Sequence, residues 1–202
     1  MRTACIDVGS NTTRLLVADR EGRRLVEVHQ ERDFTQLARK VAATGAIGPA
    51  RLAEVVALVE AQVAAARAHG AARVRIVATA AVRNASDGAL FAAAVQSRTG
   101  LTVEILSGER EARLAFGGVA GMLDEHDPAV AAPLGVVDVG GGSCELVVGD
   151  PPDGVRWWAS VGLGSGSVTE AWLTSDPPGP AELESARERI SAALAGLRPP
   201  RP

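Results

Sequence analysis

The chain has few of the residues that several classes of protein depend on. Aromatic residues make up 3% of its 202 residues and tyrosine is absent, which argues against a stacking platform for single-stranded nucleic acid. A net charge of -3 provides no general basic surface for a nucleic-acid backbone. No apolar run approaches the roughly 20 residues of a membrane-spanning helix. The sequence therefore predicts no nucleic-acid partner and no membrane partner.

Cysteine and lysine are also scarce. The two cysteines, Cys5 and Cys144, each lie in an apolar strand-like run, and no apolar segment precedes Asp7 to act as a signal sequence. These features predict a cytoplasmic protein with two buried free thiols. Lys40 is the only lysine, so arginine carries nearly all the positive charge. A GC-rich coding sequence explains this bias, and selection for arginine clamps on anions is the alternative.

Apolar residues are plentiful, at 47%, so the chain can bury a core, and its 202 residues are enough for one large domain or two small ones. Short apolar strands alternate with segments of helical periodicity. This pattern is typical of an α/β fold, in which a mainly parallel or mixed sheet packs against helices. The first predicted strands are 3–8, 12–19, 25–30, 73–78 and 101–106, and the predicted helices are 49–70, 86–99 and one that begins at 107.

The second part of the chain repeats the design of the first. Residues 136–143 (VVDVGGGS) match residues 5–12 (CIDVGSNT) as an apolar strand with one aspartate, followed by a Gly/Ser turn and a second apolar strand. A polar connection at 124–133 separates the two copies. The sequence predicts two related domains, 1–124 and 125–202, with a cleft between them. Because fewer residues follow the second turn, the second domain is predicted to be incomplete.

The two Gly/Ser turns have the composition of phosphate-binding loops. A phosphate oxygen needs several donors at close range, and glycine lets backbone N–H groups approach it with no side chain in the way. One such turn is only moderately specific, but two matched copies strengthen the prediction. The candidate phosphate ligands are Ser10, Asn11 and Thr12 in the first turn and Gly140, Gly141, Gly142 and Ser143 in the second.

Three acids near these turns are candidate metal ligands. Asp7 and Asp138 lie on apolar strands just before their turns, where a carboxylate without a partner is costly. Glu145 projects from the strand after the second turn. A hydrated Mg2+ suits such a set, since it accepts one or two carboxylates beside water and phosphate oxygens. The alternative is that these acids accept hydrogen bonds from the turn amides.

Three further features have two interpretations each. Glu111 looks on its own like an ordinary solvated acid in a first helical turn, where acids favour the helix dipole. Arg83 pairs either with a phosphate or with a neighbouring carboxylate. The loop 162–167 is either a third anion-binding turn or a connection from strand to helix.

The histidines share no metal-binding spacing and are predicted to lie on the surface: His29, His69 and His126.

Taken in order, five segments resemble the motifs of the Ppx/GppA family of exopolyphosphatases and guanosine pentaphosphate phosphohydrolases. This family belongs to the actin-like and sugar-kinase superfamily, and the resemblance spans nearly the whole chain. The segments are IDVGSNTTRLLV (6–17), ATAAVRNA (78–85), VEILSGEREARLAFGGV (103–119), VVDVGGGSCELVVG (136–149) and GLGSGSVTEAW (162–172).

The resemblance implies an actin-like (ribonuclease H-like) mixed sheet flanked by helices in each domain. It implies that Glu111 acts as general base, because the family places its base immediately before the Ala-Arg of this motif. It further implies that the two turns face each other across the cleft and hold a phosphate chain, with Mg2+ near Asp138 and Glu145. The implied substrate is inorganic polyphosphate, with guanosine pentaphosphate as the alternative. Rival functions are a non-catalytic polyphosphate- or nucleotide-binding module and a kinase.

Two features depart from the family pattern. Cys144 stands where the family usually has threonine, which removes one hydroxyl donor beside the second turn. Family members also continue well past residue 202, so the resemblance is to their N-terminal portion. The oligomeric state does not follow from the sequence, which is compatible with a homodimer.

Overall fold

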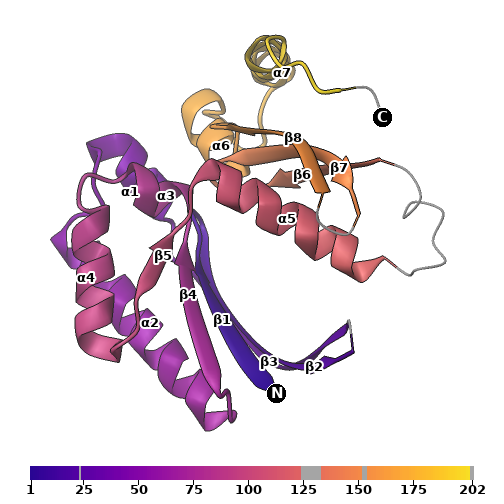
Figure 1. Ribbon diagram of the computed structural model, residues 1–202. Coiled ribbons are helices and arrows are strands. Elements are labelled where there is room, and N and C mark those ends of the chain that lie inside the picture. The colour runs from indigo at the N-terminus through magenta and orange to yellow at the C-terminus, as the bar shows by residue number, and fades with distance from the viewer. Residues whose placement is uncertain (23, 124–132, 152–153, 201–202) are drawn as a thin grey trace. The chain divides into compact units, whose positions relative to one another are not determined.

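The computed structural model describes residues 1–22, 24–123, 133–151 and 154–200. The chain forms two compact units, Met1–Ser107 and Gly108–Pro202. Each unit contains one sheet with helices against it, which confirms the predicted α/β class (Figure 1). Among the described residues, no helix combines the length and the apolarity needed to cross a membrane.

The first unit is a five-stranded mixed sheet in the order β3-β2-β1-β4-β5. The first three strands form an antiparallel meander, and β4 and β5 add to it in parallel. Figure 1 shows the helices of this unit on one side of the sheet. The strands are β1 (Arg2–Val8), β2 (Thr12–Glu21), β3 (Arg24–Phe34), β4 (Arg73–Ala78) and β5 (Val103–Ile105), and the helices are α1 (Leu37–Thr44), α2 (Pro49–Ala68), α3 (Ala80–Asn84) and α4 (Gly88–Thr99).

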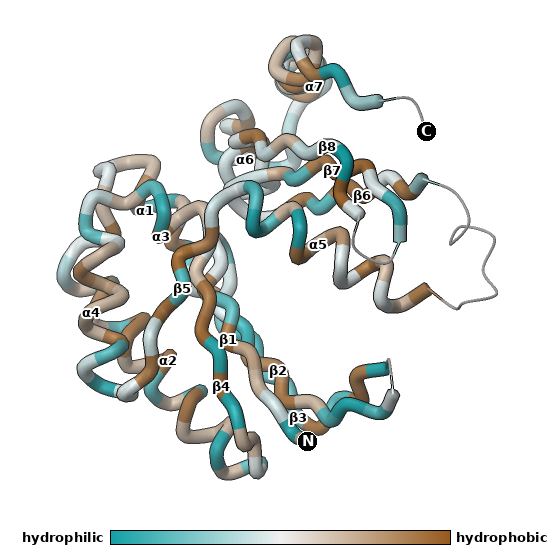
Figure 2. The backbone as a smooth tube through the Cα atoms, viewed as in Figure 1, coloured by the Kyte–Doolittle hydropathy of each residue, from teal (hydrophilic) through white to brown (hydrophobic). Residues whose placement is uncertain are grey.

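The core of the first unit follows from alternation along its strands. On β1, Ala4, Ile6 and Val8 are buried and belong to one apolar cluster with Val59 of α2. Figure 2 shows the apolar stretches of these strands and helices in brown. Cys5 points to the opposite face and is exposed, so the prediction of a buried thiol is wrong for this residue.

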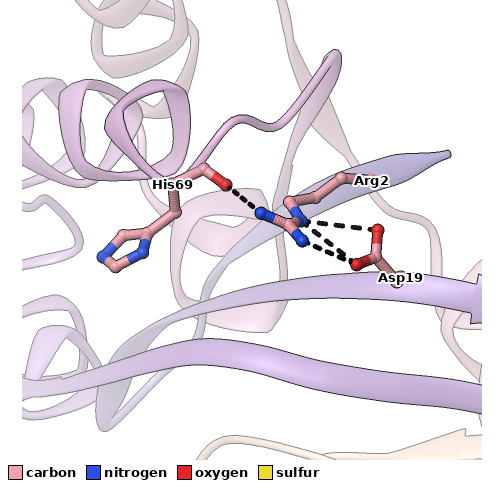
Figure 3. A network of polar contacts seen from close by, with 3 residues as sticks. All are labelled: Arg2, Asp19 and His69. Carbon is pink, nitrogen blue, oxygen red and sulfur yellow. Dashed lines mark hydrogen bonds and ion pairs between the residues drawn. The ribbon is translucent and has the colours of Figure 1, made fainter.

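Arg2 connects three elements at the start of β1. Its guanidinium contacts the carboxylate of Asp19 on β2 at 2.7 Å and donates to the backbone carbonyl of His69, 2.9 Å away, at the end of α2 (Figure 3). The hydrogen bond from Arg2 is the main cause that lowers the pKa of Asp19. One side chain thus ties the first two strands to the helix that packs on them.

The second unit repeats the element order of the first. A strand, a Gly/Ser turn, two further antiparallel strands and two helices occur in the same succession, which confirms the predicted duplication. Its sheet has the order β6-β7-β8 among the described residues. The elements are α5 (Gly108–Met122), β6 (Leu134–Val139), β7 (Cys144–Asp150), β8 (Gly154–Val161), α6 (Ser165–Trp172) and α7 (Pro180–Leu194).

Helix α5 packs with the second sheet. Its residues Ala112, Phe116 and Ala120 are buried in one cluster with Val136 of β6 and Val147 of β7. Figure 1 shows α5 running along one face of β6–β8. The compact units consequently divide between Ser107 and Gly108, whereas the sequence predicts the boundary after residue 124, beyond this helix.

The segment before α7 closes around the carboxylate of Glu182. This carboxylate accepts hydrogen bonds from the backbone N–H and hydroxyl groups of Thr174 and Ser175 and from the N–H of Gly179 at 2.8 Å. The bonds from Ser175 and Thr174 hold the pKa of Glu182 far below its ordinary value. Ala186 is the one residue of α7 that is buried. The N-terminus of this helix is therefore held mainly by the local hydrogen bonds to Glu182.

Truncation of Phe116 tests the packing of α5. Phe116 is fully buried, so Phe116→Ala should lower the free energy of unfolding by about 3–5 kcal/mol. Leu114→Ala on the same helix is the control, because Leu114 is 45% exposed. Urea denaturation of the full chain measures both changes, and equal losses would contradict the packing described for α5.

Substitution of Glu182 tests the network before α7. Because the folded-state pKa lies below the unfolded value of about 4.3, the stabilisation is present above pH 4.3 and disappears as the pH falls towards the folded-state pKa. Glu182→Gln should therefore lower the Tm at pH 7. At pH 3 the Tm of the variant should lie closer to that of the unmodified chain. Thermal melts at both values measure the two differences. A difference that does not change with pH would show that the carboxylate charge plays no part.

Candidate active site

The second Gly/Ser turn is held from behind by the start of α6. The N–H of Gly140 donates to the carbonyl of Ser143 at 2.9 Å and closes the turn. The carbonyls of Gly140 and Gly141 accept hydrogen bonds from the N–H groups of Ser165 and Ser167 at 2.8 and 3.1 Å. The Ser167 hydroxyl also lies 3.3 Å from the carbonyl oxygen of Gly142. All three glycine carbonyls of the turn therefore have partners.

Gly164 allows this close approach. A Cβ atom at this position would lie 2.3 Å from the backbone nitrogen of Gly142 and 2.4 Å from the carbonyl carbon of Gly141. No other residue type fits there without displacing the turn. The loop 162–167 thus connects β8 to α6, and the amides of Ser165 and Ser167 serve the second turn, which favours the interpretation as a connection over that of a third anion-binding turn.

The first Gly/Ser turn has the same construction. The N–H of Gly9 donates to the carbonyl of Thr12 at 3.0 Å, as Gly140 does to Ser143. The carbonyl of Asn11 accepts from Thr35 and Gln36, and the carbonyl of Ser10 accepts from the N–H of Ala38 at 2.8 Å, in the first turn of α1. Gln36 adopts the left-handed conformation, with φ of 48°, to direct its amide there.

The backbone amides at the tips of both turns differ from the carbonyls, because no acceptor for them occurs among the described residues. In the part of the chain that the structure describes, the backbone N–H groups of Ser10, Asn11, Gly141 and Gly142 donate to no other residue. Successive N–H groups in such turns form anion-binding concavities. The hydrogen bonds that fix the turns therefore use the carbonyls and leave the donors that a phosphate requires.

Three polar residues form a row across the second sheet. Asp138, Glu145 and Ser160 are direct cross-strand neighbours on β6, β7 and β8, so their side chains lie on one face. Glu145 is only 3% exposed, and its carboxylate accepts a hydrogen bond from the Ser160 hydroxyl at 2.7 Å. Asp138 is exposed. Ser160 is not among the site residues predicted from the sequence, because its place beside Glu145 depends on cross-strand register, which composition and spacing do not reveal.

Asp138 and Glu145 are the carboxylates of this row that the sequence predicts as Mg2+ ligands. Across the described ranges, no three histidine, cysteine, aspartate or glutamate residues form a metal-binding group. Mg2+ commonly uses one or two protein carboxylates and completes its shell with water and phosphate oxygens. Asp138 and Glu145, which are cross-strand neighbours on one face of the sheet, are the residues that could hold such an ion. Asp7 lies in the first unit, opposite Arg14 on β2, with its Oδ1 atom buried.

Glu111 differs from the other acid of the same helical turn. Glu109 is exposed and pairs with Arg113 at 3.0 Å, as an ordinary solvated first-turn acid does. Glu111 is half-buried and precedes Ala112, which is fully buried in the core with the second sheet. Glu111 therefore belongs to the same compact unit as Glu145.

Arg83 and the first turn belong to the other unit. Arg83 lies in α3, where the sequence predicts a polar loop, and its Nη1 donates to the carbonyl of Leu106 at 2.6 Å. Helix α3 follows Thr79, whose N–H donates to Val8 at the end of β1. The structure thus connects Arg83 to the strand that leads into the first turn. The meeting of both turns with Glu111 in one cleft stays a prediction.

Cys144 lies directly after the second turn. Its thiol is buried, and burial is the main cause that raises its pKa, with the charges of Glu145 and Asp138 adding to the effect. The thiol is therefore protonated at neutral pH, and the prediction of a buried free thiol is confirmed at this position.

The fold and the two matched turns define the class of protein. A duplicated strand-turn-strand unit with helices against a mixed sheet is the actin-like fold. Residues 16–199 match the model of the Ppx/GppA phosphatase family, and the chain belongs to that family.

Relatives and solved structures agree with this assignment. The chain is 35% identical to Exopolyphosphatase 2 of Mycobacterium tuberculosis, over 96% of this chain and 63% of the relative. The crystal structure of the Aquifex aeolicus family member superposes with a TM-score of 0.80 at 32% identity, covering 99% of this chain and 63% of that one. The chain thus spans less than two thirds of the length of these proteins.

Gly164→Ala tests the support of the second turn. The added Cβ meets the backbone of Gly141 and Gly142, so the turn must move and the chain should lose stability. Gly162→Ala is the control within the same loop, because a Cβ there meets nothing within 4 Å. Amide NMR shifts of 140–143, together with the Tm, should change in the first variant and stay nearly constant in the second. Matching spectra for both variants would exclude the contact.

Proposed function

We propose that the chain supplies the phosphate-binding turns and the general base of a phosphoanhydride hydrolase that releases the terminal phosphate of inorganic polyphosphate. The observation that carries the proposal is the matched construction of the two turns, each held through its carbonyls with amides at Ser10, Asn11, Gly141 and Gly142 left as donors. A polyanion with repeated phosphate groups suits two donor sets of the same kind.

In this proposal Glu111 activates the attacking water. A carboxylate base within reach of a water takes up its proton as the oxygen bonds to the terminal phosphorus and the bridging P–O bond breaks. The turn amides, the hydroxyls of Ser10, Thr12 and Ser143, and Arg83 stabilise the charge on the phosphate oxygens. Asp138 and Glu145 would hold Mg2+, with Asp7 as a further ligand, and the ion would neutralise developing charge.

The relatives favour polyphosphate as the substrate. Two of the proteins most similar in sequence carry the names Exopolyphosphatase 2 and Exopolyphosphatase 1, both from mycobacteria. Guanosine pentaphosphate is the second candidate, because the family name covers both activities. A chain that binds polyphosphate without releasing phosphate would instead be a binding module, and transfer from ATP to an acceptor other than water would indicate a kinase.

Glu111→Gln tests the general base. Removal of a positioned base typically costs roughly 10²- to 10⁴-fold in rate, so turnover should fall by about that factor while binding of the substrate changes little. Glu109→Gln is the matched control, since Glu109 lies in the same helical turn but is exposed and paired with Arg113. The assay is phosphate release from long-chain polyphosphate with Mg2+, beside a binding measurement with the same polymer.

The two variants also define the contrary result. Unchanged turnover in Glu111→Gln would remove this residue from the reaction, and equal losses in both variants would point to a general effect on α5. Binding without any phosphate release by the unmodified chain would support the binding module.

A further inference from the structure

Ser160 lies between two elements of the candidate site. It occupies β8 beside Glu145, and on the same face of the sheet it touches the start of α5, the helix that carries Glu111. All of these residues belong to the second unit, so their arrangement depends on a single core.

The first contact is the hydrogen bond to Glu145. The Ser160 hydroxyl donates to the carboxylate at 2.7 Å, and this carboxylate is almost fully buried. The hydroxyl is a donor to a group that has left water, and a buried polar group that loses its donor bears a desolvation cost. Ser160 therefore fixes the orientation of the Glu145 carboxylate.

The second contact is steric. A Cβ atom placed on Gly108 would lie 2.7 Å from the Cβ and 2.9 Å from the Oγ of Ser160. Only glycine permits this approach, so the first turn of α5 rests directly on β8 at Ser160. Glu111 follows Gly108 within that turn, and its position along the sheet is therefore set by the same contact.

We propose that Ser160 is a positioning residue that holds the buried carboxylate of Glu145 and the first turn of α5 in a fixed relation. Its hydroxyl fixes the carboxylate of Glu145 on the face that register gives it in common with Asp138, while its Cβ sets how closely α5 approaches the sheet. The proposal rests on the proposed function, in which Glu145 binds Mg2+ and Glu111 activates water. Ser160 itself contacts neither phosphate nor metal in this scheme.

Ser160→Ala separates the two contacts, because it removes the hydroxyl and keeps the Cβ. Partners that orient metal ligands typically affect metal affinity by 10- to 100-fold, so the Kd for Mg2+ or Mn2+ should rise by roughly that factor. The Tm should also fall, because the buried carboxylate of Glu145 loses its donor. Calorimetry with Mg2+ alone and electron paramagnetic resonance with Mn2+ alone measure the affinity in the full chain. Ser191→Ala, at an exposed position on α7, is the control and should bind the metal normally.

Activity provides a second measurement on the same variant. Phosphate release by Ser160→Ala should be reduced at low Mg2+ and should recover as Mg2+ is raised, because the defect lies in occupancy of the metal site. A loss that no Mg2+ concentration restores, or metal binding equal to that of the unmodified chain, would overturn the role assigned to the hydroxyl.

A double substitution tests the steric contact without any need for metal or activity. Gly108→Ala should lower the Tm, because its Cβ overlaps Ser160. In a Ser160→Gly background the overlapping Cβ is gone, so Gly108→Ala should lower the Tm less than it does in the unmodified chain. The metal affinity should be weak in both Ser160→Gly variants because the hydroxyl is missing. If Gly108→Ala has no effect, or if it costs the same Tm in both backgrounds, the contact does not position α5.

The outcomes distinguish this proposal from the proposed function. An unmodified chain that binds Mg2+ but releases no phosphate would contradict the hydrolase, while the Ser160 comparisons on affinity and Tm would still stand. An unmodified chain that binds neither Mg2+ nor Mn2+ would overturn the part of the proposal that concerns Glu145.

Discussion

The structure depends on how the backbone carbonyls of two short turns find their hydrogen-bond partners. Every backbone polar group removed from water needs a partner, and the first N–H groups of a helix have none within the helix. In this protein the two requirements satisfy each other, because the amides at the starts of α1 and α6 donate to the carbonyls of the first and second turns. Each turn thereby becomes rigid while its own amides at the tip stay available.

This solution is the same in both units although the side chains differ. The first unit uses Gln36 in the left-handed conformation to bring its amide to Asn11. The second unit uses Gly164, which approaches the backbone of the turn too closely for any side chain. The turns themselves are polar in one copy and glycine-rich in the other. What the duplication has kept is therefore a pattern of backbone hydrogen bonds, and the residues have changed around it.

Much of the fold could be predicted because alternation and turn composition are local signals. The strands β1, β2 and β6, the long helix α2 and the repeat of the two turns all follow from such signals. Helix α1 could not be predicted, because it is short and starts after a left-handed Gln36 with no side-chain cap. The role of Asp87 could not be predicted either, because its carboxylate accepts hydrogen bonds from the amides of Ile47 and Gly48, far away in the sequence. These features depend on tertiary contacts, which no local window contains.

The place of α5 shows why the candidate site was harder to predict than the fold. In sequence, Glu109 and Glu111 are equivalent acids of one helical turn, and only the resemblance to a family separates them. In the structure they differ because Ala112 and Phe116 bury one face of α5 against the second sheet, which leaves Glu109 exposed beside Arg113 and Glu111 half-buried. The same packing assigns Glu111 to the unit that contains Glu145 and the second turn. The spacing of Glu111 and Glu145 is then set by one apolar core, and a motion between the two units would leave that spacing unchanged.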